Sequence, residues 1–286
     1  MEQLMKEKGK TQAALTITRP TETACIYHGD CRDMLKSLPD GCASLIVSSP
    51  PYSMGRSYED RSAGLETFHK LHKSIFRDMY RILKPSGSIC WQVGSYVTKG
   101  EVFPLDIEVF NIFSELGNNL DPPLVCRGRI IWTFGHGLHC KHRFSGRYET
   151  ILWFTKGEIR KDVENLPPYD MWDIPNVKGN HVEKTSHPCQ YPIALPKRLI
   201  HALTAEGELV VDPFLGAGTS GAAAVLEKRH FAGAEMQEDY IRTAEERIRQ
   251  AADGTLRYRA DVPVKEPDMR TAQARKPREW LEDISL

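Results

Sequence analysis

Apolar and polar positions alternate along the chain in two patterns, one typical of short buried strands and the other of amphipathic helices. The apolar run at residues 43–48 predicts a buried strand, which Ser49-Pro50-Pro51-Tyr52 ends because proline cannot continue a strand ladder. Apolar residues then recur at helical spacing from Thr67 to Leu83, and the turn at 84–87 ends this helix.

The same two patterns repeat through the rest of the chain. Further strands are predicted at residues 88–93, 128–134, 148–155, 209–211 and 231–234. Further helices are predicted at residues 103–116, 194–203 and 238–251, and from a glycine-rich turn to residue 227. Strands that alternate with helices favour an α/β fold, with a mostly parallel sheet and helices on both of its faces. Such sheets bind their ligands at the carboxyl ends of the strands.

Composition sets the broad class of protein. With 286 residues, of which 41% are apolar, the chain is long enough for one large α/β domain. It has neither an apolar run long enough to span a membrane nor a segment that resembles a signal peptide, so we expect a cytoplasmic protein without a membrane partner. The seven cysteines include no C-x-x-C pair and are expected to be reduced. Zero net charge argues against a simple nucleic-acid coating protein, but not against an enzyme with a local basic face.

A glycine-rich turn joins the predicted strand at 209–211 to the helix that follows. Glycine lets a ligand approach the backbone closely, and Asp212 at the strand end is placed to pair with a cationic group, such as the amino group of S-adenosylmethionine. Glu235 ends the next strand, where an acid commonly binds ribose hydroxyls. Together they predict a site for a nucleoside-type cofactor, whose candidate residues are Asp212, Pro213, Phe214, Gly216, Gly218, Thr219, Ser220 and Glu235.

The segment Ser49-Pro50-Pro51-Tyr52 has a plain interpretation as a proline-rich strand exit and a chemical one as a catalytic loop. The exocyclic amine of cytosine or adenine is a poor nucleophile, because its lone pair is delocalised into the ring. The Ser49 hydroxyl and the Pro50 carbonyl are two acceptors that could hold its N–H groups, and the prolines Pro50 and Pro51 would fix them in place. Tyr52 is suited to stack on a flipped-out base.

With both loops, in this order, the sequence resembles the beta class of amino DNA methyltransferases over roughly residues 25–250. The resemblance includes Tyr27-His28-Gly29-Asp30-Cys31, which implies that Asp30 contacts the cofactor, and His187-Pro188, which implies a lining for its methionine end. It implies a Rossmann-like methyltransferase fold that uses S-adenosylmethionine. The implied units are a flexible lead, a catalytic half, a target-recognition insert, a cofactor-binding half and a charged tail, at residues 1–23, 24–155, 156–186, 187–253 and 254–286.

The first residue of the catalytic loop bears on the target base. Within the family, Ser-Pro-Pro-Tyr is typical of cytosine-N4 enzymes and Asp-Pro-Pro-Tyr of adenine-N6 enzymes, so Ser49 favours cytosine N4 and leaves adenine N6 as the alternative. Two further hypotheses are methylation of RNA or protein and a DNA-binding module without activity. The intact loop argues against the inactive module, and the short insert favours DNA. The resemblance also leaves open a cognate restriction endonuclease and a homodimer.

A basic stretch is the expected contact to double-stranded DNA. No acidic residue occurs between Arg127 and Tyr148, and the alternative is a solvated loop with counter-charges elsewhere in the fold. Trp172 in the insert is a further candidate, for stacking on a base. The cluster around His136, His139 and His142 fits no standard zinc spacing, so we expect no metal site. The candidate DNA-binding residues are Arg127, Arg129, Lys141, Arg143, Arg147 and Trp172.

Overall fold

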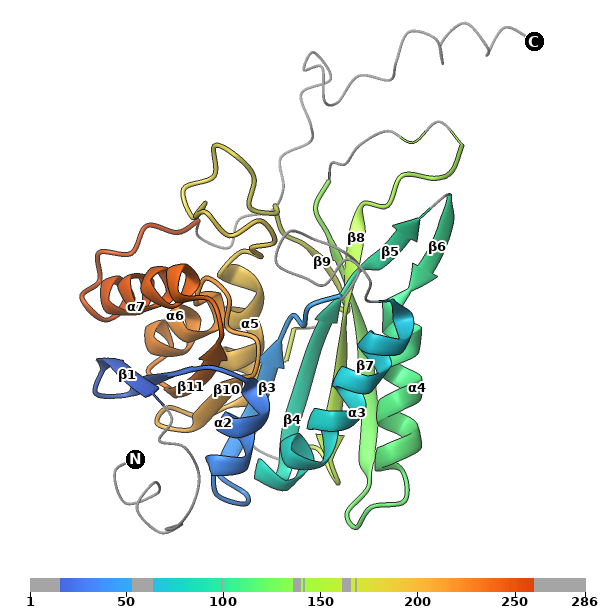
Figure 1. Cartoon of the computed structure of the whole chain (residues 1–286), viewed down its shortest axis with the longest axis horizontal. Coiled ribbons are helices and arrows are strands. Elements are labelled where there is room, and N and C mark those ends of the chain that lie inside the picture. Colours follow the sequence, from blue (N-terminus) through green and yellow to red (C-terminus); the bar gives the residue numbers. More distant parts are fainter. Residues whose placement is uncertain are drawn as a thin grey trace, which may run out of the picture.

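Nine strands form one mixed sheet through the centre of the molecule (Figure 1). The computed structural model describes residues 16–52, 64–98, 100–135, 140, 142–160, 166–167 and 169–259. In order across the sheet, the strands are β1 (Thr16–Thr21), β2 (Ala24–His28), β11 (His230–Glu235), β10 (Leu209–Asp212), β3 (Ala43–Ser48), β4 (Leu83–Val93), β8 (Tyr148–Lys156), β7 (Leu124–Thr133) and β9 (Met171–Asp173).

Most of these strands run in one direction. The strands β2, β11, β10, β3 and β4 are parallel neighbours, and β9 is parallel to β7. Because β8 is antiparallel to both β4 and β7, the strand β7 points the same way as β4. The carboxyl ends of β3, β4, β7, β10 and β11 therefore open on one edge of the sheet, the upper edge in Figure 1. This is the mostly parallel α/β sheet that the alternation of strands and helices predicts.

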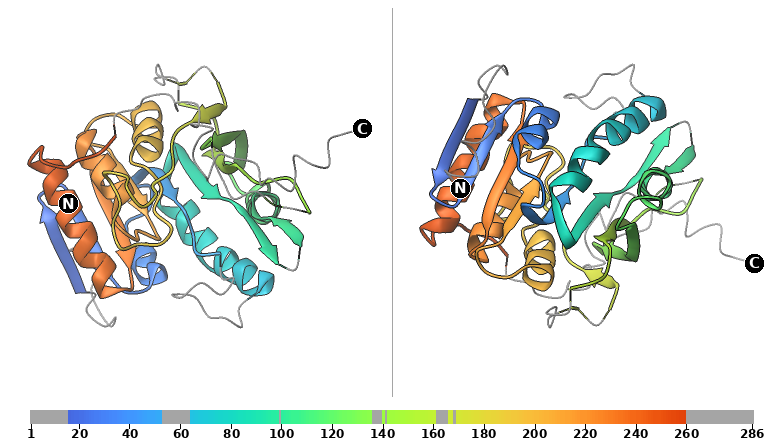
Figure 2. Two further views of the ribbon diagram at one scale, coloured as in Figure 1. Left: turned by 90° about the horizontal axis from the view of Figure 1, so that it is seen from above. Right: turned by 90° about the horizontal axis from the view of Figure 1, so that it is seen from below.

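Helices cover both faces of the sheet, and a cluster of buried apolar side chains lies beneath each layer. On one face lie α2 (Cys31–Ser37), α3 (Leu65–Ile82) and α4 (Leu105–Gly117), and on the other lie α5 (Ala194–Leu203), α6 (Thr219–Leu226) and α7 (Glu238–Ala252). Figure 2 shows the two helix layers with the sheet between them, viewed from above and from below relative to Figure 1. Strands covered on both faces are buried along their whole length and are mostly apolar, as β3 and β10 are.

The structure differs from the sequence-based expectations at several short elements. The flexible lead predicted for residues 1–23 is wrong for Thr16–Thr21, which form the antiparallel edge strand β1. The insert predicted at 156–186 contributes β9 to the far edge of the sheet. A separate hairpin, β5 (Ser95–Thr98) with β6 (Glu101–Pro104), lies between β4 and α4 in the chain. These strands are short or polar, so they carry too little periodicity to be recognised.

Among the described residues, no helix combines the length and apolar character that crossing a membrane requires.

Candidate active site

A cavity of about 620 Å³ opens at the carboxyl edge of the sheet, and the two loops singled out in the sequence both line it. From the catalytic loop it takes Ser49, Pro50, Pro51 and Tyr52. From the candidate cofactor residues it takes Asp30, His187, Pro188, Pro213, Phe214, Gly216, Thr219 and Glu235. Segments far apart in the chain are thus brought into one site, at the edge where parallel sheets bind ligands.

The two loops meet because the strands that lead into them are neighbours. β3 and β10 pair in parallel, with Ile46 opposite Val211, so the chain leaves both strands at the same edge. A buried hydrogen bond ties the exits together: the Ser48 hydroxyl donates to Oδ1 of Asp212 over 2.5 Å. The position of the catalytic loop is therefore fixed directly by the cofactor loop.

Asp212 differs from its expected role. Its side chain is fully buried and is not part of the cavity lining, so the structure does not place it where the expected pairing with a cationic ligand would occur. Its carboxylate accepts hydrogen bonds from the Ser48 hydroxyl, from the Ser220 hydroxyl and from the Phe214 amide. Burial raises the pKa of this carboxyl from 3.8 to about 6, although the three hydrogen bonds oppose the rise. Asp212 therefore holds the catalytic loop and the glycine loop in position through these three hydrogen bonds.

The two glycines of the cofactor loop serve different contacts, and both have a positive φ, +53° at Gly216 and +76° at Gly218. A Cβ on Gly216 would lie 3.1 Å from Nε2 of His187, inside the cavity wall. A Cβ on Gly218 would lie 2.7 Å from the Cα of Ala244, so this glycine allows α7 to approach the loop. Gly218 and Ser220 were expected to bind the cofactor, but neither is among the residues that line the cavity.

Two acids of the predicted set do line the cavity, and their environments differ. Glu235 ends β11, and its carboxylate accepts hydrogen bonds from the amides of Gly216 and Gln237, over 2.9 Å and 2.8 Å. Burial raises the pKa of Glu235. Asp30 caps the N-terminus of α2 and pairs with Arg32, whose guanidinium lowers the pKa of Asp30. Asp30 is thus held as an ionised acceptor, whereas Glu235 also holds the glycine loop in place.

The catalytic loop presents one free hydroxyl and one anchored ring. Within the described part of the chain, the Ser49 hydroxyl makes no hydrogen bond, and it remains available to a ligand in the cavity. The Tyr52 hydroxyl accepts a hydrogen bond from the Gly94 amide over 2.6 Å, which fixes the ring in the cavity wall. A ring held in this way can stack on a base without first losing rotational freedom.

Several other residues that line the cavity belong to none of the motifs in the sequence. Gln92 of β4 and Glu149 of β8 form part of the wall, and the Gln92 amide donates to the Glu149 carboxylate. Asn176 and Lys178 come from the predicted insert, and burial lowers the pKa of Lys178. Tyr240 of α7 packs its ring edge-on against His187, with centroids 4.5 Å apart. Gln92 lies in a predicted strand that ends at this edge, which is the signal that could have identified it.

The candidate DNA-binding residues are spread over different parts of the fold. Arg127 lies at the opposite edge of the sheet, where its guanidinium donates to the Thr155 hydroxyl over 2.8 Å and to the Gly157 carbonyl over 2.7 Å. Arg129 forms an ion pair with Asp106 of α4. The placement of Arg127 thus contradicts a shared contact surface with the catalytic loop.

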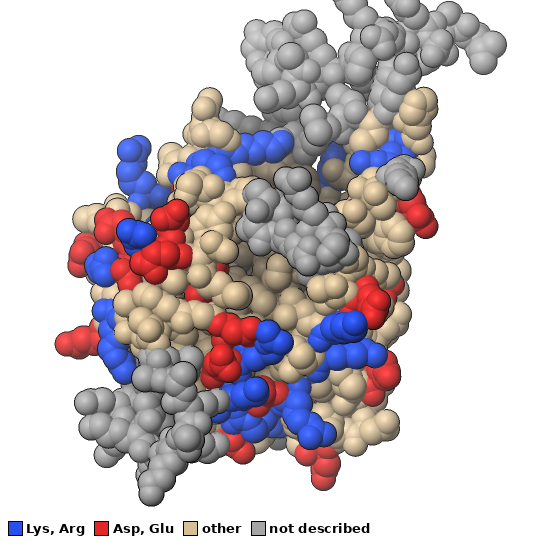
Figure 3. Space-filling model, in the orientation of Figure 1, with Lys and Arg blue, Asp and Glu red and all other residues tan. Residues whose placement is uncertain are grey.

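Trp172 was expected to stack on DNA, but its side chain is only 3% exposed and belongs to the apolar core. Its indole N–H donates to the Tyr169 carbonyl, and the Arg198 guanidinium lies over its ring, so it anchors the insert. Arg143 and Arg147 precede β8 at the carboxyl edge. Figure 3 shows Lys and Arg along the upper rim of this face, while Lys and Arg mix with Asp and Glu below.

Lys141, His136 and His139 lie outside the described residues. Among the residues that are described, no group of three or more His, Cys, Asp or Glu side chains is arranged to hold a metal ion.

The fold and the cavity define the class: a Rossmann-like α/β domain with a nucleoside-type site next to a loop suited to an amine. Residues 43–246 match the model of the N6/N4 DNA methylase family, which is more than half of the chain. The chain belongs to this family, and it is a DNA methyltransferase of the amino-methylating class.

Curated relatives include methyltransferases from several bacteria. The chain is 39% identical over 245 residues to the type II methyltransferase M.BglII of Bacillus subtilis. This alignment covers 76% of this chain and 66% of the relative. It is 27% identical over 298 residues to the DNA adenine methyltransferase YhdJ of Escherichia coli K12, in an alignment that covers 87% of this chain and 96% of the relative.

Solved structures show the same fold. The cytosine-N4-specific PvuII DNA methyltransferase superposes with a TM-score of 0.65 at 25% identity, over 82% of this chain and 92% of that one. TTHA0409 of Thermus thermophilus, in complex with S-adenosyl-L-methionine, superposes with a TM-score of 0.63 at 27% identity, over 80% of this chain and 96% of that one.

Proposed function

We propose that this protein transfers a methyl group from S-adenosylmethionine to the exocyclic N4 of a cytosine that is flipped out of double-stranded DNA. The observation that carries the proposal is the shared cavity. Ser49 and Tyr52 of one loop and Gly216 of the other line the same space at the carboxyl edge of the sheet. One wall of this cavity is suited to bind a methyl donor, and the other is suited to bind the base that accepts the methyl group.

The residues present fit S-adenosylmethionine. The cavity is in the size range of small-molecule sites, and it combines apolar surface at Pro213 and Phe214 with the acids Asp30 and Glu235. Gly216 keeps the floor open, because a Cβ there would press against His187. The cofactor supplies an electrophilic methyl group when it is bound. Glu235, at the end of β11, is the residue we assign to the ribose hydroxyls, and Asp30 is assigned to the adenine end.

The residues of the catalytic loop hold the amine. The Ser49 hydroxyl and the Pro50 carbonyl accept its two N–H groups, which turns the nitrogen lone pair out of conjugation with the ring. Tyr52 packs on the base, and its hydroxyl is kept in place by the Gly94 amide. The Ser48–Asp212 hydrogen bond sets the position of this loop relative to the cofactor loop, so orientation supplies part of the rate.

The choice between cytosine N4 and adenine N6 rests on Ser49. Serine in the first loop position is typical of the cytosine-N4 enzymes in the family that this sequence resembles, and PvuII methyltransferase supports the same choice. The adenine methyltransferase YhdJ, at 27% identity, supports the alternative. The type II relatives further lead us to propose a restriction–modification role, in which methylation protects DNA from a cognate endonuclease.

Labelled cofactor and unmethylated bacterial genomic DNA test the proposal, with RNA and protein as parallel substrates. We expect label in DNA alone and N4-methylcytosine after digestion to nucleosides. N6-methyladenine would instead show that the alternative base is correct, and label only in RNA or protein would contradict the proposal.

Ser49→Ala should lower kcat by about 100-fold or more, because one oriented acceptor is lost from the transition state. Ser95→Ala, at an exposed serine of β5, is the matched control and should leave kcat unchanged. Near-normal turnover by Ser49→Ala in a folded protein would remove Ser49 from this role.

A further inference from the structure

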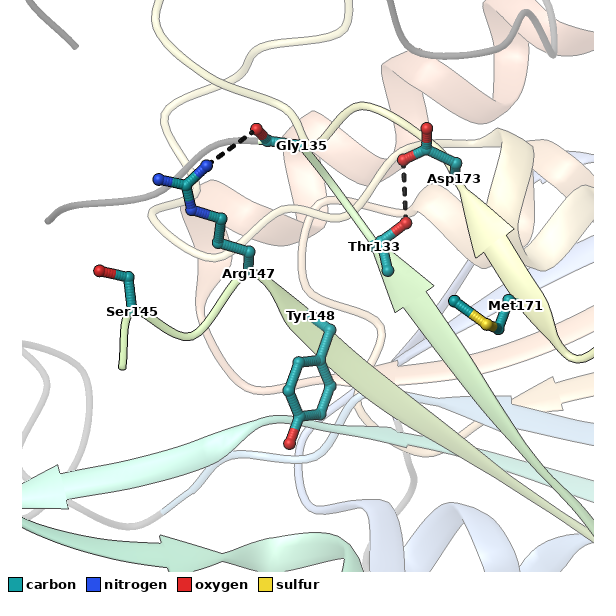
Figure 4. A pocket seen from close by; sticks show the side chains of 7 residues that line it. All are labelled: Thr133, Gly135, Ser145, Arg147, Tyr148, Met171 and Asp173. Atoms are coloured by element: carbon teal, nitrogen blue, oxygen red, sulfur yellow. Dashed lines mark hydrogen bonds between the residues drawn. The ribbon is translucent and has the colours of Figure 1, made fainter. Parts of the chain in front are cut away.

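A second pocket, of about 450 Å³, opens beside the ends of β7, β8 and β9 (Figure 4). None of the described residues lines both this pocket and the cavity described above. Its lining residues come from the three strand ends and from the segment that precedes β8, and they are Thr133, Gly135, Ser145, Arg147, Tyr148, Met171 and Asp173.

Strand alternation places the two pockets on opposite faces of the same strands. On β7, Trp132 lines the active-site cavity, whereas the next residue, Thr133, lines the second pocket. On β8, Glu149 lines the cavity and Tyr148 lines the second pocket. The register agrees, because Trp132 lies opposite Glu149 and Thr133 opposite Tyr148. Successive side chains of a strand point to opposite faces, so the two pockets lie on opposite faces. Both reach the same edge of the sheet, because Thr133 ends β7 and Tyr148 begins β8.

The second pocket presents two polar groups of opposite charge. Among the described residues, the Arg147 guanidinium makes one hydrogen bond, a long one of 3.5 Å, to the Gly135 carbonyl. Oδ1 of Asp173 accepts from the Thr133 hydroxyl over 2.9 Å, and Figure 4 shows the other carboxylate oxygen directed away from that bond. Both groups thus keep hydrogen-bonding capacity for a ligand.

Apolar and aromatic side chains surround these groups and are exposed to solvent. Tyr148 is 49% exposed and Met171 is 67% exposed. Exposed apolar surface that is rimmed by polar groups marks interaction sites, and here it lies at the edge that holds the proposed base site. Aromatic rings next to an arginine are suited to nucleobases.

We propose that this pocket reads a G·C base pair of the DNA substrate next to the target base. Arg147 donates to O6 and N7 of the guanine, and Asp173 accepts from N4 of the paired cytosine, which are the pairings that the major-groove edges of these bases favour. The proposal rests on the proposed function, since it names part of the sequence that the enzyme selects. Arg147 and Asp173 are thereby specificity-determining residues.

The charge arrangement favours a base edge over a phosphate. A phosphate near Arg147 would also approach the Asp173 carboxylate, and like charges repel. A base pair offers acceptors to the arginine and a donor to the acid at the same time. A contact to the DNA backbone alone would strengthen binding without selecting a sequence, which the experiment distinguishes.

The experiment compares Arg147→Lys, Arg147→Ala and Asp173→Asn with the unaltered protein. Arg242→Ala is the matched control, because Arg242 is an exposed arginine of α7. The methylated sites in unmethylated bacterial genomic DNA are first mapped by sequencing. Each protein is then assayed on synthetic duplexes in which one base pair of that site is replaced at a time, and kcat/KM is measured for each duplex.

We expect the Arg147 and Asp173 variants to lose discrimination at the same G·C pair, by about 5- to 150-fold in the ratio of kcat/KM values. Arg147→Lys retains the charge but loses the forked geometry, so it should lose selectivity while it keeps most of its DNA affinity. The control should keep the selectivity of the unaltered protein. Thermal melting of each variant shows whether it is folded.

A uniform loss of kcat/KM on all duplexes would assign Arg147 to the phosphate backbone and overturn the proposal, as would unchanged selectivity or a site without a G·C pair. In each of these cases the unaltered protein still methylates DNA, so the proposed function stands. If the unaltered protein labels no DNA at all, the proposed function fails, and the recognition pocket fails with it.

Discussion

Replacement of Asp212 by asparagine should stabilise the protein at neutral pH, although it removes the acid of the glycine loop. The pKa of the buried carboxyl is raised from 3.8 to about 6, so its folded form binds a proton more tightly than the unfolded chain does. The protonated carboxyl therefore contributes to the stability of the fold, and this contribution is fully present below pH 3.8 and is lost as the pH rises through 6. A rise of about two pKa units corresponds to about 3 kcal/mol at pH 7.

Asparagine keeps the shape and most of the hydrogen bonds. Its Oδ1 can accept from the Ser48 hydroxyl and the Phe214 amide, which both bind Oδ1 of Asp212, and its amide can donate to the Ser220 hydroxyl. Asp212→Asn should therefore raise the free energy of unfolding by up to about 3 kcal/mol at pH 7. Asp212→Ala leaves three buried donors without an acceptor and should lower it by about 2–4 kcal/mol.

Urea unfolding, followed by tryptophan fluorescence without cofactor, measures these effects from pH 4 to pH 7.5. The gap between Asp212→Asn and the unaltered protein should be small at pH 4 and should grow up to pH 7. Calorimetry should show that Asp212→Asn keeps the affinity for S-adenosylmethionine and that Asp212→Ala lowers it. A gap that does not change with pH, or equal destabilisation by both variants, would refute the reasoning.

Three further outcomes follow from single contacts. Gly218→Ala should destabilise the protein by about 2 kcal/mol or more in urea unfolding, since its Cβ would lie 2.7 Å from the backbone of Ala244. Tyr52→Phe should change kcat/KM by less than about 10-fold, whereas Tyr52→Ala should lower it by more, because only the second change removes the stacking ring. Burial lowers the pKa of His72 from 6.5 to about 4. The neutral imidazole therefore contributes about 3 kcal/mol to the free energy of unfolding, and this contribution is complete above pH 6.5 and is lost as the pH falls through 4. His72→Gln should remove this pH dependence, and an unchanged slope would count against it.

The main elements of the fold could be predicted because they are long or fully buried. The helix α3 repeats apolar residues on one face over its 18 residues, and β3 is buried at every position. β9 has three residues, of which only Trp172 is buried, and β1 has only exposed and partly exposed positions. Such strands are held by pairing with a neighbour, and a pattern along one segment does not reveal the partner.

The candidate site could be predicted where a loop follows a buried strand. It was harder to predict where the register between strands determines which face of the sheet a side chain takes. Ser49 and Gly216 are found from their own segments, because parallel strands place their exits at one edge. Glu149 and Tyr148 are adjacent in the sequence but face different pockets, and the pairing with β7 determines which face each takes. Arg127 was misplaced for a related reason: it lies near the amino end of β7, so a strand's length carries it away from the site.

The buried position of Asp212 gives it a part in holding the two loops together. An acid at a strand end next to a glycine loop predicts a ligand contact, yet this acid is buried beneath the loop and accepts from two hydroxyls and an amide. Because one of those hydroxyls belongs to Ser48, a shift of Asp212 moves the residue that precedes Ser49. The acid thus couples the cofactor loop to the catalytic loop through a single buried hydrogen bond. Asp212→Ala, which removes these hydrogen bonds, should therefore affect cofactor affinity and turnover together, whereas substitutions at Ser49 should affect turnover alone.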